Sequence, residues 1–189
     1  MVVGLGNPGE RYSGTRHNVG FMLIDRLAVK LNASFSRMQS KALVASETYN
    51  KRRIILAKPQ TFMNLSGHSV QGLVHFYKIP MINLLIAHDD LDLPVGAIRI
   101  RPDGGSAGQM GMESIIQRLS TDEFARIRLG IGRPPGQMQA ADYVLQDFPN
   151  DEKVLISGTL NSSVEAVLTF VMEGLEAAMN KYNVSAVQP

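Results

Sequence analysis

Residues 1–9, Met1-Val2-Val3-Gly4-Leu5-Gly6-Asn7-Pro8-Gly9, decide the fold. Met1–Leu5 is a short apolar run, and the glycines, asparagine and proline that follow are turn residues, so we predict a strand that ends in a tight turn. Val19–Leu31 then carries apolar residues at helical spacing, which predicts an amphipathic helix. A strand that leads through a turn into a helix is the building unit of α/β proteins.

The rest of the chain continues this alternation. Short apolar runs that end in turn residues predict further strands over Arg53–Ala57, Leu84–Ala87, Ala97–Arg101 and Ala125–Ile131. Helical spacing predicts helices over Ser66–Tyr77 and Met112–Leu119, and one or two helices over Val154–Met179. We therefore predict a single compact α/β domain over residues 1–189, with a twisted mixed β-sheet flanked by helices and an acidic helical C-terminal part from about residue 150.

Composition narrows the class of protein. A chain of 189 residues with 44% hydrophobic and 19% charged residues is typical of one soluble domain. Without cysteine, neither disulfides nor thiolate zinc sites are available. We find no run of about 18 apolar residues to span a bilayer and no room for a signal or transit peptide before the first turn. These observations predict a cytoplasmic protein with no membrane partner.

Charge is unevenly distributed along the chain. Residues 1–133 carry 17 Lys and Arg against 10 Asp and Glu, whereas residues 134–189 carry 2 against 7. The runs Ile98-Arg99-Ile100-Arg101 and Arg126-Ile127-Arg128-Leu129 alternate, so each predicted strand has one apolar and one basic face. Such a face could bind phosphate groups of a polyanion, or it could simply be solvated. Both interpretations stay open at this point.

Polar residues follow three of the predicted strands. They are Asn7 with His17 beyond it, Phe62-Met63-Asn64, and His88-Asp89-Asp90. In open α/β sheets the binding crevice lies at the carboxyl ends of the strands, so we expect these clusters to share one crevice if the strands are neighbours. Histidine titrates near neutral pH, and His17 is therefore a candidate general base, with a structural histidine as the alternative. Asp89, Asp90 and Asp92 are candidates to orient it.

Other chemistries fit less well. Gly4–Gly9 resembles half of a dinucleotide fingerprint, but Pro8 interrupts the spacing, and no P-loop lysine follows. No cysteine or Gly-x-Ser-x-Gly serine offers a nucleophile, so water activated by His17 is the simplest hydrolytic scheme. A metal site at His88, Asp89 and Asp92 remains an alternative. Asn7 and Asn64 suit recognition of a peptide-like amide, or turn formation and helix capping. Phe62, Met63 and Met110 could be core residues or apolar pocket walls.

Several motifs occur together and in a fixed order. The chain resembles a bacterial-type peptidyl-tRNA hydrolase from its first residue to about Phe148, and its acidic helical tail lies where the family has one. The motifs that carry this resemblance are Gly4–Gly9, Tyr12, Thr15-Arg16-His17-Asn18, Lys58-Pro59-x-Thr61-Phe62-Met63-Asn64-x-Ser66-Gly67, His88-Asp89-Asp90-Leu91-Asp92-Leu93-Pro94 and Gly130-Ile131-Gly132-Arg133-Pro134.

The resemblance implies hydrolysis of the ester between a peptide, or an N-blocked amino acid, and the 3′ end of tRNA, by a cytoplasmic monomer that needs no metal, cofactor or obligate protein partner. It implies that His17 activates water, that Asp89 orients His17, and that Asn7 distinguishes peptidyl-tRNA from aminoacyl-tRNA. The tRNA 3′ end and the adjacent peptide would meet Tyr12, Phe62 and Asn64. The tRNA 5′ phosphate on the acceptor stem would be held by Arg101 and Arg128.

The chain departs from the family at one position pair. Many members have a histidine and an asparagine where this chain has Gln109 and Met110. Methionine cannot donate the hydrogen bond of the asparagine to the tRNA acceptor end, so weaker substrate binding is expected, by about 0.5–1.5 kcal/mol. The departure also leaves an alternative of another class, a non-catalytic RNA-binding relative of the splicing-cofactor type.

Overall fold

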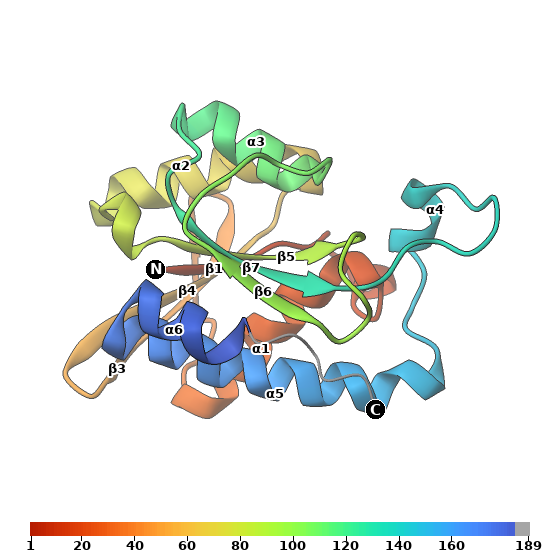
Figure 1. Ribbon diagram of the computed structural model, residues 1–189. Coiled ribbons are helices and arrows are strands. Elements are labelled where there is room, and N and C mark those ends of the chain that lie inside the picture. Colours follow the sequence, from red (N-terminus) through yellow and green to blue (C-terminus); the bar gives the residue numbers. More distant parts are fainter. Residues whose placement is uncertain (184–189) are drawn as a thin grey trace.

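The computed structural model describes residues 1–183 and contains a seven-stranded mixed sheet with the order β2-β3-β4-β1-β5-β7-β6 (Figure 1). The four strands β4, β1, β5 and β7 run parallel, and β2, β3 and β6 are antiparallel to their neighbours. The predicted α/β class with a mixed sheet is confirmed. The strands are β1 (Val2–Gly4), β2 (Arg37–Gln39), β3 (Ala42–Tyr49), β4 (Arg52–Pro59), β5 (Leu85–Asp90), β6 (Ile98–Arg101) and β7 (Ala125–Gly130).

Helices cover both faces of the sheet (Figure 1). Helices α2 and α3 lie on one face, and α1, α5 and α6 lie on the other, each layer closing its own apolar core against alternate residues of the strands. The helices are α1 (Val19–Leu31), α2 (Ser66–Tyr77), α3 (Met110–Leu119), α4 (Ala140–Val144), α5 (Asn150–Glu173) and α6 (Leu175–Tyr182). Short 3₁₀ turns are η1 (Glu10–Tyr12), η2 (Arg16–Asn18), η3 (Met63–Leu65) and η4 (Met81–Asn83).

Two glycines let α1 start directly against the central strands. A Cβ atom on Gly4 would lie 2.2 Å from the carbonyl oxygen of Gly20, and one on Gly20 would lie 2.5 Å from the carbonyl oxygen of Ala87. Phe21 also donates its backbone N–H to Leu5 O at 3.2 Å. This contact fixes the residues just before α1, which include His17, beside the carboxyl ends of β1 and β5.

The sequence prediction missed the strands β2 and β3 at the edge of the sheet. Both are joined to their partners by two-residue hairpins, and their turn residues are Ser40-Lys41 and Asn50-Lys51. All four have positive φ, between 47° and 66°, without any glycine. The usual glycine signal for such turns is therefore missing from the sequence. The short helix α4 was also not predicted.

The expectation that no segment is long and apolar enough to span a bilayer needs correction. Helix α5, with 24 residues, is long and apolar enough to cross a membrane by length and composition alone. Half of its most apolar stretch is buried inside the protein, however, where Ile156, Leu160, Val164 and Val167 belong to the core. A core helix of a soluble protein has the same properties, so α5 is only weak evidence for a membrane span.

Candidate active site

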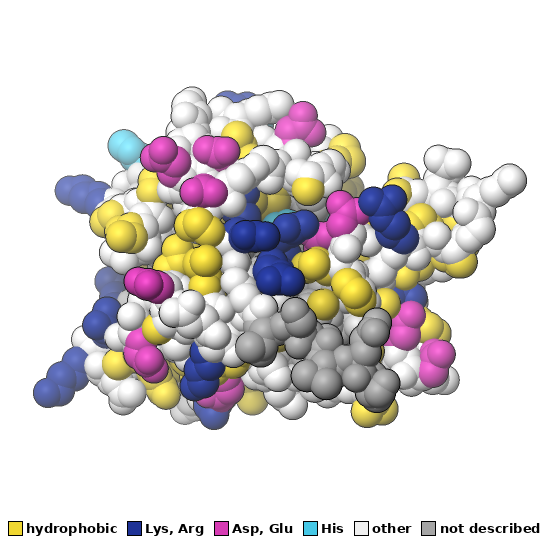
Figure 2. All heavy atoms as spheres, viewed as in Figure 1, with side chains coloured by type: hydrophobic (Ala, Val, Ile, Leu, Met, Phe, Trp, Pro, Cys, Tyr) yellow, Lys and Arg dark blue, Asp and Glu magenta, His cyan; other side chains and the backbone are white. Residues whose placement is uncertain are grey.

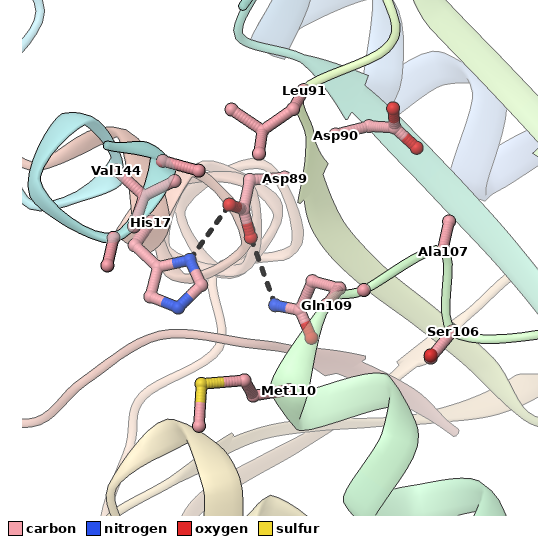
Figure 3. Close-up of a pocket in the computed structure, with 12 residues that line it drawn as sticks. His17, Asp89, Asp90, Leu91, Ser106, Ala107, Gln109, Met110 and Val144 are labelled. Atoms are coloured by element: carbon pink, nitrogen blue, oxygen red, sulfur yellow. Dashed lines mark hydrogen bonds and ion pairs between the residues drawn. The ribbon is translucent and has the colours of Figure 1, made fainter. Parts of the chain in front are cut away.

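His17 and Asp89 meet at the carboxyl end of β5. His17 comes from η2, Asp89 from β5, and His17 Nδ1 lies 2.8 Å from Asp89 Oδ2 (Figure 3). Both are buried, with His17 9% and Asp89 3% exposed. A carboxylate only accepts hydrogen bonds, so the proton lies on Nδ1 and the lone pair on Nε2, which points away from Asp89 toward the side where Met110 lies. Of the three predicted aspartates, only Asp89 contacts the histidine.

The other two aspartates pair with arginines. Asp90 Oδ2 accepts from Arg128 Nε at 2.5 Å, and Asp92 Oδ1 accepts from Arg133 Nη2 at 2.5 Å. The Asp90 carboxylate points away from His17 (Figure 3).

A cavity of about 190 Å³ lies beside the His17–Asp89 pair. Besides that pair its lining is largely apolar, and it comes from the end of β5, the loop before α3, the start of α3, and α4. The remaining lining residues are Asp90, Leu91, Ser106, Ala107, Gly108, Gln109, Met110, Ala140, Ala141 and Val144. We call this the catalytic cavity, because it adjoins His17 and Asp89, the two residues predicted from the sequence to act in catalysis.

Arg16 anchors the segment that carries His17. Its guanidinium group lies over the rings of Tyr143 and Phe148, at 4.4 and 5.0 Å from their centroids, and pairs with Glu152 at 2.6 Å. Tyr143 belongs to α4, whose residues form one wall of the catalytic cavity. A single buried arginine therefore joins η2 to α4 and to the start of α5.

The turn after β1 is held by paired amides. The Asn7 backbone N–H donates to Asn18 Oδ1 at 2.8 Å, and Asn18 Nδ2 donates to Asn7 O at 2.9 Å. Asn7 Oδ1 accepts from the backbone N–H of Met63 at 2.9 Å, which joins the ends of β1 and β4. Asn7 thus has the structural role considered from the sequence, and within residues 1–183 its Nδ2 has no hydrogen-bond partner. No role was predicted for Asn18 from the sequence, where an amide residue directly after His17 was the available signal.

The other residues predicted for the tRNA 3′ end lie outside the catalytic cavity. Phe62 is 56% exposed, Asn64 is exposed, and Tyr12 is half-buried with its hydroxyl accepting from Arg11 Nη2 at 2.5 Å. Asn64 does not cap α2, since the N-cap is Leu65 and no side-chain cap bond is present. Tyr12 lies on η1, Asn64 lies on η3 and Phe62 directly precedes η3, at the same edge of the sheet as Asn7. Met110, which is 54% exposed, does line the cavity.

A second cavity, of about 370 Å³, adjoins the catalytic cavity, shares Ser106 and Ala107 with it, and is basic. The pairing of β6 with β7 places Arg99 beside Arg128 and Arg101 beside Arg126, so all four arginines share one face. Figure 2 shows Lys and Arg side chains gathered over β6 and β7. We call this the basic cavity; its lining residues are His88, Arg101, Asp103, Gly104, Gly105, Ser106, Ala107, Arg126 and Arg128.

The arginines of this cavity do not have equal roles. Arg101 is exposed, and Arg128 is half-buried beside Asp90. Arg126 is only 2% exposed, and its guanidinium group donates to backbone carbonyl oxygens. Burial lowers the pKa of Arg126 below its ordinary value. Arg126 therefore supports the surrounding loops, whose accepting carbonyls belong to Gly104, Gly105, Asp122 and Phe124.

His88 faces the basic cavity and not Asp89's side of the strand. Its Nδ1 lies 2.8 Å from the backbone oxygen of Asp89, and complete burial lowers the pKa of His88 below its ordinary value. Over residues 1–183 no three histidine, aspartate or glutamate side chains gather in a way that could hold a metal ion. The alternative metal site at His88, Asp89 and Asp92 is therefore not assembled.

A sequence model of the peptidyl-tRNA hydrolase family matches residues 1–189. The chain belongs to the peptidyl-tRNA hydrolase family. It is 48% identical over 97% of its length to the peptidyl-tRNA hydrolase of Chloroflexus aggregans, covering 98% of that protein. A crystal structure of the peptidyl-tRNA hydrolase from Acinetobacter baumannii matches 97% of the chain and 93% of its own, with 34% identity and a TM-score of 0.92.

These matches confirm the family predicted from the motifs. The alternative of a non-catalytic RNA-binding relative is not supported, because the relatives are named for the hydrolase. In this member of the peptidyl-tRNA hydrolase family, Gln109 lies next to the His17–Asp89 pair, and Met110 forms part of the cavity wall (Figure 3).

Proposed function

We propose that this chain hydrolyses the ester between a peptide, or an N-blocked amino acid, and the 3′ end of tRNA, with His17 as general base and Asp89 as its orienting partner. The observation that carries the proposal is the 2.8 Å contact between His17 Nδ1 and Asp89 Oδ2 at the wall of a small, largely apolar cavity. A buried carboxylate in this position fixes the tautomer and stabilises the imidazolium ion that forms during the reaction.

The reaction then proceeds without a covalent enzyme intermediate. Water beside His17 gives a proton to Nε2 as its oxygen bonds to the ester carbonyl carbon. The tetrahedral adduct collapses by breaking the bond to the tRNA 3′ oxygen, and His17 returns its proton to that leaving oxygen. The products are a free carboxyl group and a tRNA with an intact 3′ end, and His17 is again neutral.

Substrate recognition is proposed to divide between two places. Asn7 has a free amide nitrogen that can donate to a peptide carbonyl oxygen, which an unblocked aminoacyl-tRNA lacks. Phe62, Asn64 and Tyr12 are accessible to the tRNA 3′ end at the same edge of the sheet. Arg101 and Arg128 would hold the tRNA 5′ phosphate at the basic cavity.

The proposal also covers the part of the tRNA that is bound, the oligomeric state and the cellular location. The acceptor stem is the part of the tRNA that carries both the 3′ ester and the 5′ phosphate. The enzyme would act as a monomer without an obligate protein partner, because both proposed binding places lie on one chain. Its substrate arises in translation, which supports a cytoplasmic location.

Release of the N-blocked amino acid from N-acetyl-aminoacyl-tRNA tests the activity and the base together. Replacing His17 with alanine is expected to lower kcat by about 10²–10⁴-fold, because general base catalysis is lost. The circular dichroism spectrum and the affinity for deacylated tRNA should stay close to those of the wild type. A His17→Ala enzyme with near-wild-type turnover would show that another group activates water.

A further inference from the structure

The Gln109 side chain lies between the first turn of α3 and the catalytic carboxylate. It is 8% exposed, and its Oε1 accepts from the backbone N–H of Met112 at 2.8 Å. Its Nε2 donates to Asp89 Oδ1 at 3.0 Å (Figure 3). The same nitrogen lies 3.3 Å from the sulfur of Met63. Gln109 therefore caps α3 with one end of its amide and contacts the His17–Asp89 pair with the other.

Only one orientation of this amide satisfies both neighbours. The backbone N–H of Met112 needs an acceptor, and the Asp89 carboxylate needs a donor. Turning the amide by 180° would face a nitrogen toward an N–H group and an oxygen toward a carboxylate. The capping bond therefore fixes the direction in which Nε2 donates.

The two oxygens of Asp89 are thus held from opposite sides. Oδ2 accepts from His17 and Oδ1 accepts from Gln109. A buried carboxylate that loses one such partner can rotate about its side-chain bonds, and His17 would turn with it. The geometry points to Gln109 as a positioning residue for the reaction: it locks Asp89, and through Asp89 the ring of His17, to the N-terminal end of α3. This inference rests on the proposed roles of His17 and Asp89.

Few ionisable side chains line the catalytic cavity, so the effect of a charge placed at position 109 can be measured. Among the described residues that line the catalytic cavity, the ionisable side chains are His17, Asp89 and Asp90, and Asp90 is turned toward Arg128. Gln109 is thus an uncharged donor to an anion. A carboxylate placed there would add negative charge to the pair without disturbing another ion pair.

Two substitutions separate positioning from helix capping. Serine is a good N-cap residue, so Gln109→Ser keeps a bond to the first turn of α3 but is too short to reach Asp89. Gln109→Glu keeps an acceptor for the Met112 N–H and replaces the donor to Asp89 by an oxygen. Gln117→Glu is the matched control, because Gln117 is exposed on the same helix and the chemical change is identical.

We expect Gln109→Ser to lower kcat about 10-fold, with KM within about 2-fold of the wild type and an unchanged melting temperature. For Gln109→Glu the added charge favours the imidazolium form of His17, so the acid limb of kcat against pH moves to higher pH by roughly half a unit to one unit. Gln117→Glu should match the wild type in both kcat and pH profile.

Two results would overturn the inference. One is that both Gln109 variants keep wild-type kcat and an unmoved acid limb, which would leave Gln109 as a helix cap only. The other is that KM rises while kcat holds, which would make Gln109 a substrate-binding residue. His17→Ala, measured in parallel, separates failure of this inference from failure of the proposed function. If His17→Ala loses turnover while the Gln109 variants behave like the wild type, the proposed base stands and only the role of Gln109 fails.

Discussion

The catalytic cavity and the basic cavity adjoin each other beside β5 and share Ser106 and Ala107, but their remaining walls differ in chemistry. The first has apolar walls around one buried hydrogen-bonded pair, whereas the second has three arginines around an open hollow. The first suits a chemical step, which needs fixed groups shielded from water, and the second suits attraction of a phosphate, which needs accessible charge. The division predicts that substitutions of the hydrogen-bonded residues His17, Asp89 and Gln109 change kcat, and that substitutions of accessible arginines change KM and its salt dependence.

The substitution Asp89→Asn tests the catalytic cavity and has the largest expected effect. An amide at this position can donate to Nδ1 of His17 and so favour the tautomer whose Nε2 carries the proton, which removes the base. We expect kcat to fall about 10³–10⁴-fold, while KM and its dependence on salt stay near the wild-type values. Single-turnover kinetics at several salt concentrations check this. A large rise in KM would mean that Asp89 contributes to binding.

The substitution Arg126→Met tests whether one arginine of the basic cavity is structural. It leaves four backbone carbonyls without their donor, so the free energy of unfolding in urea should fall by about 2–4 kcal/mol. Arg101→Met, the same change at an exposed neighbour, should alter it by less than about 0.5 kcal/mol. If Arg126→Met unfolds like the wild type but binds tRNA weakly, Arg126 is a ligand and the assignment is wrong.

The substitution Arg101→Gln tests the binding side. Loss of one phosphate contact should raise KM about 10-fold and reduce the slope of log KM against log salt by about 1, with kcat unchanged. Substrate without a 5′ phosphate should erase the difference between variant and wild type. Arg53→Gln, on β4, serves as the matched control. An equal effect of both variants would indicate general charge attraction and no specific phosphate site.

The smallest expected effect belongs to Met110→Asn. An asparagine at this wall of the catalytic cavity can donate a hydrogen bond to the tRNA acceptor end, which methionine cannot. We expect KM to fall about 2- to 10-fold, as one gained hydrogen bond implies, with little change in kcat. Steady-state kinetics on N-acetyl-aminoacyl-tRNA measure this, and Met110→Leu is the apolar control. An unchanged KM would show that the departure from the family pattern at this position has no cost.

Helices with regular apolar spacing and a clear end were predicted correctly from the sequence. Helices α1 and α2 have the predicted bounds, since each has regular apolar spacing and ends at a residue in the left-handed conformation, Asn32 and Lys78. The three polar clusters lie at neighbouring strand ends because β4, β1 and β5 are adjacent. Of their members, His17, Asp89 and Asp90 line the catalytic cavity, whereas Phe62 and Asn64 lie outside it. Pairing of His17 with one of three aspartates was predicted, but the choice of Asp89 was implied only by the family resemblance.

What the sequence could not give depends on three-dimensional packing. Alternation in β7 indicates that Arg126 and Arg128 share a face, but not that Arg126 is buried beneath loop carbonyls while Arg128 stays accessible. Likewise, the contact between Gln109 and Asp89 joins residues 20 positions apart through the angle at which α3 meets the sheet. No local pattern in the sequence encodes the burial of Arg126 or the contact between Gln109 and Asp89.

Consecutive residues of one buried strand serve the two cavities, His88 the basic one and Asp89 the catalytic one. Adjacent Cα atoms are about 3.8 Å apart, and hydrogen bonds to β1 and β7 on both sides hold this strand in place. Loop movements can reshape the walls of either cavity, but they cannot change this spacing. Strand β5 therefore fixes the positions of His88 and Asp89 relative to each other, while the shared residues Ser106 and Ala107 can change the walls of both cavities together.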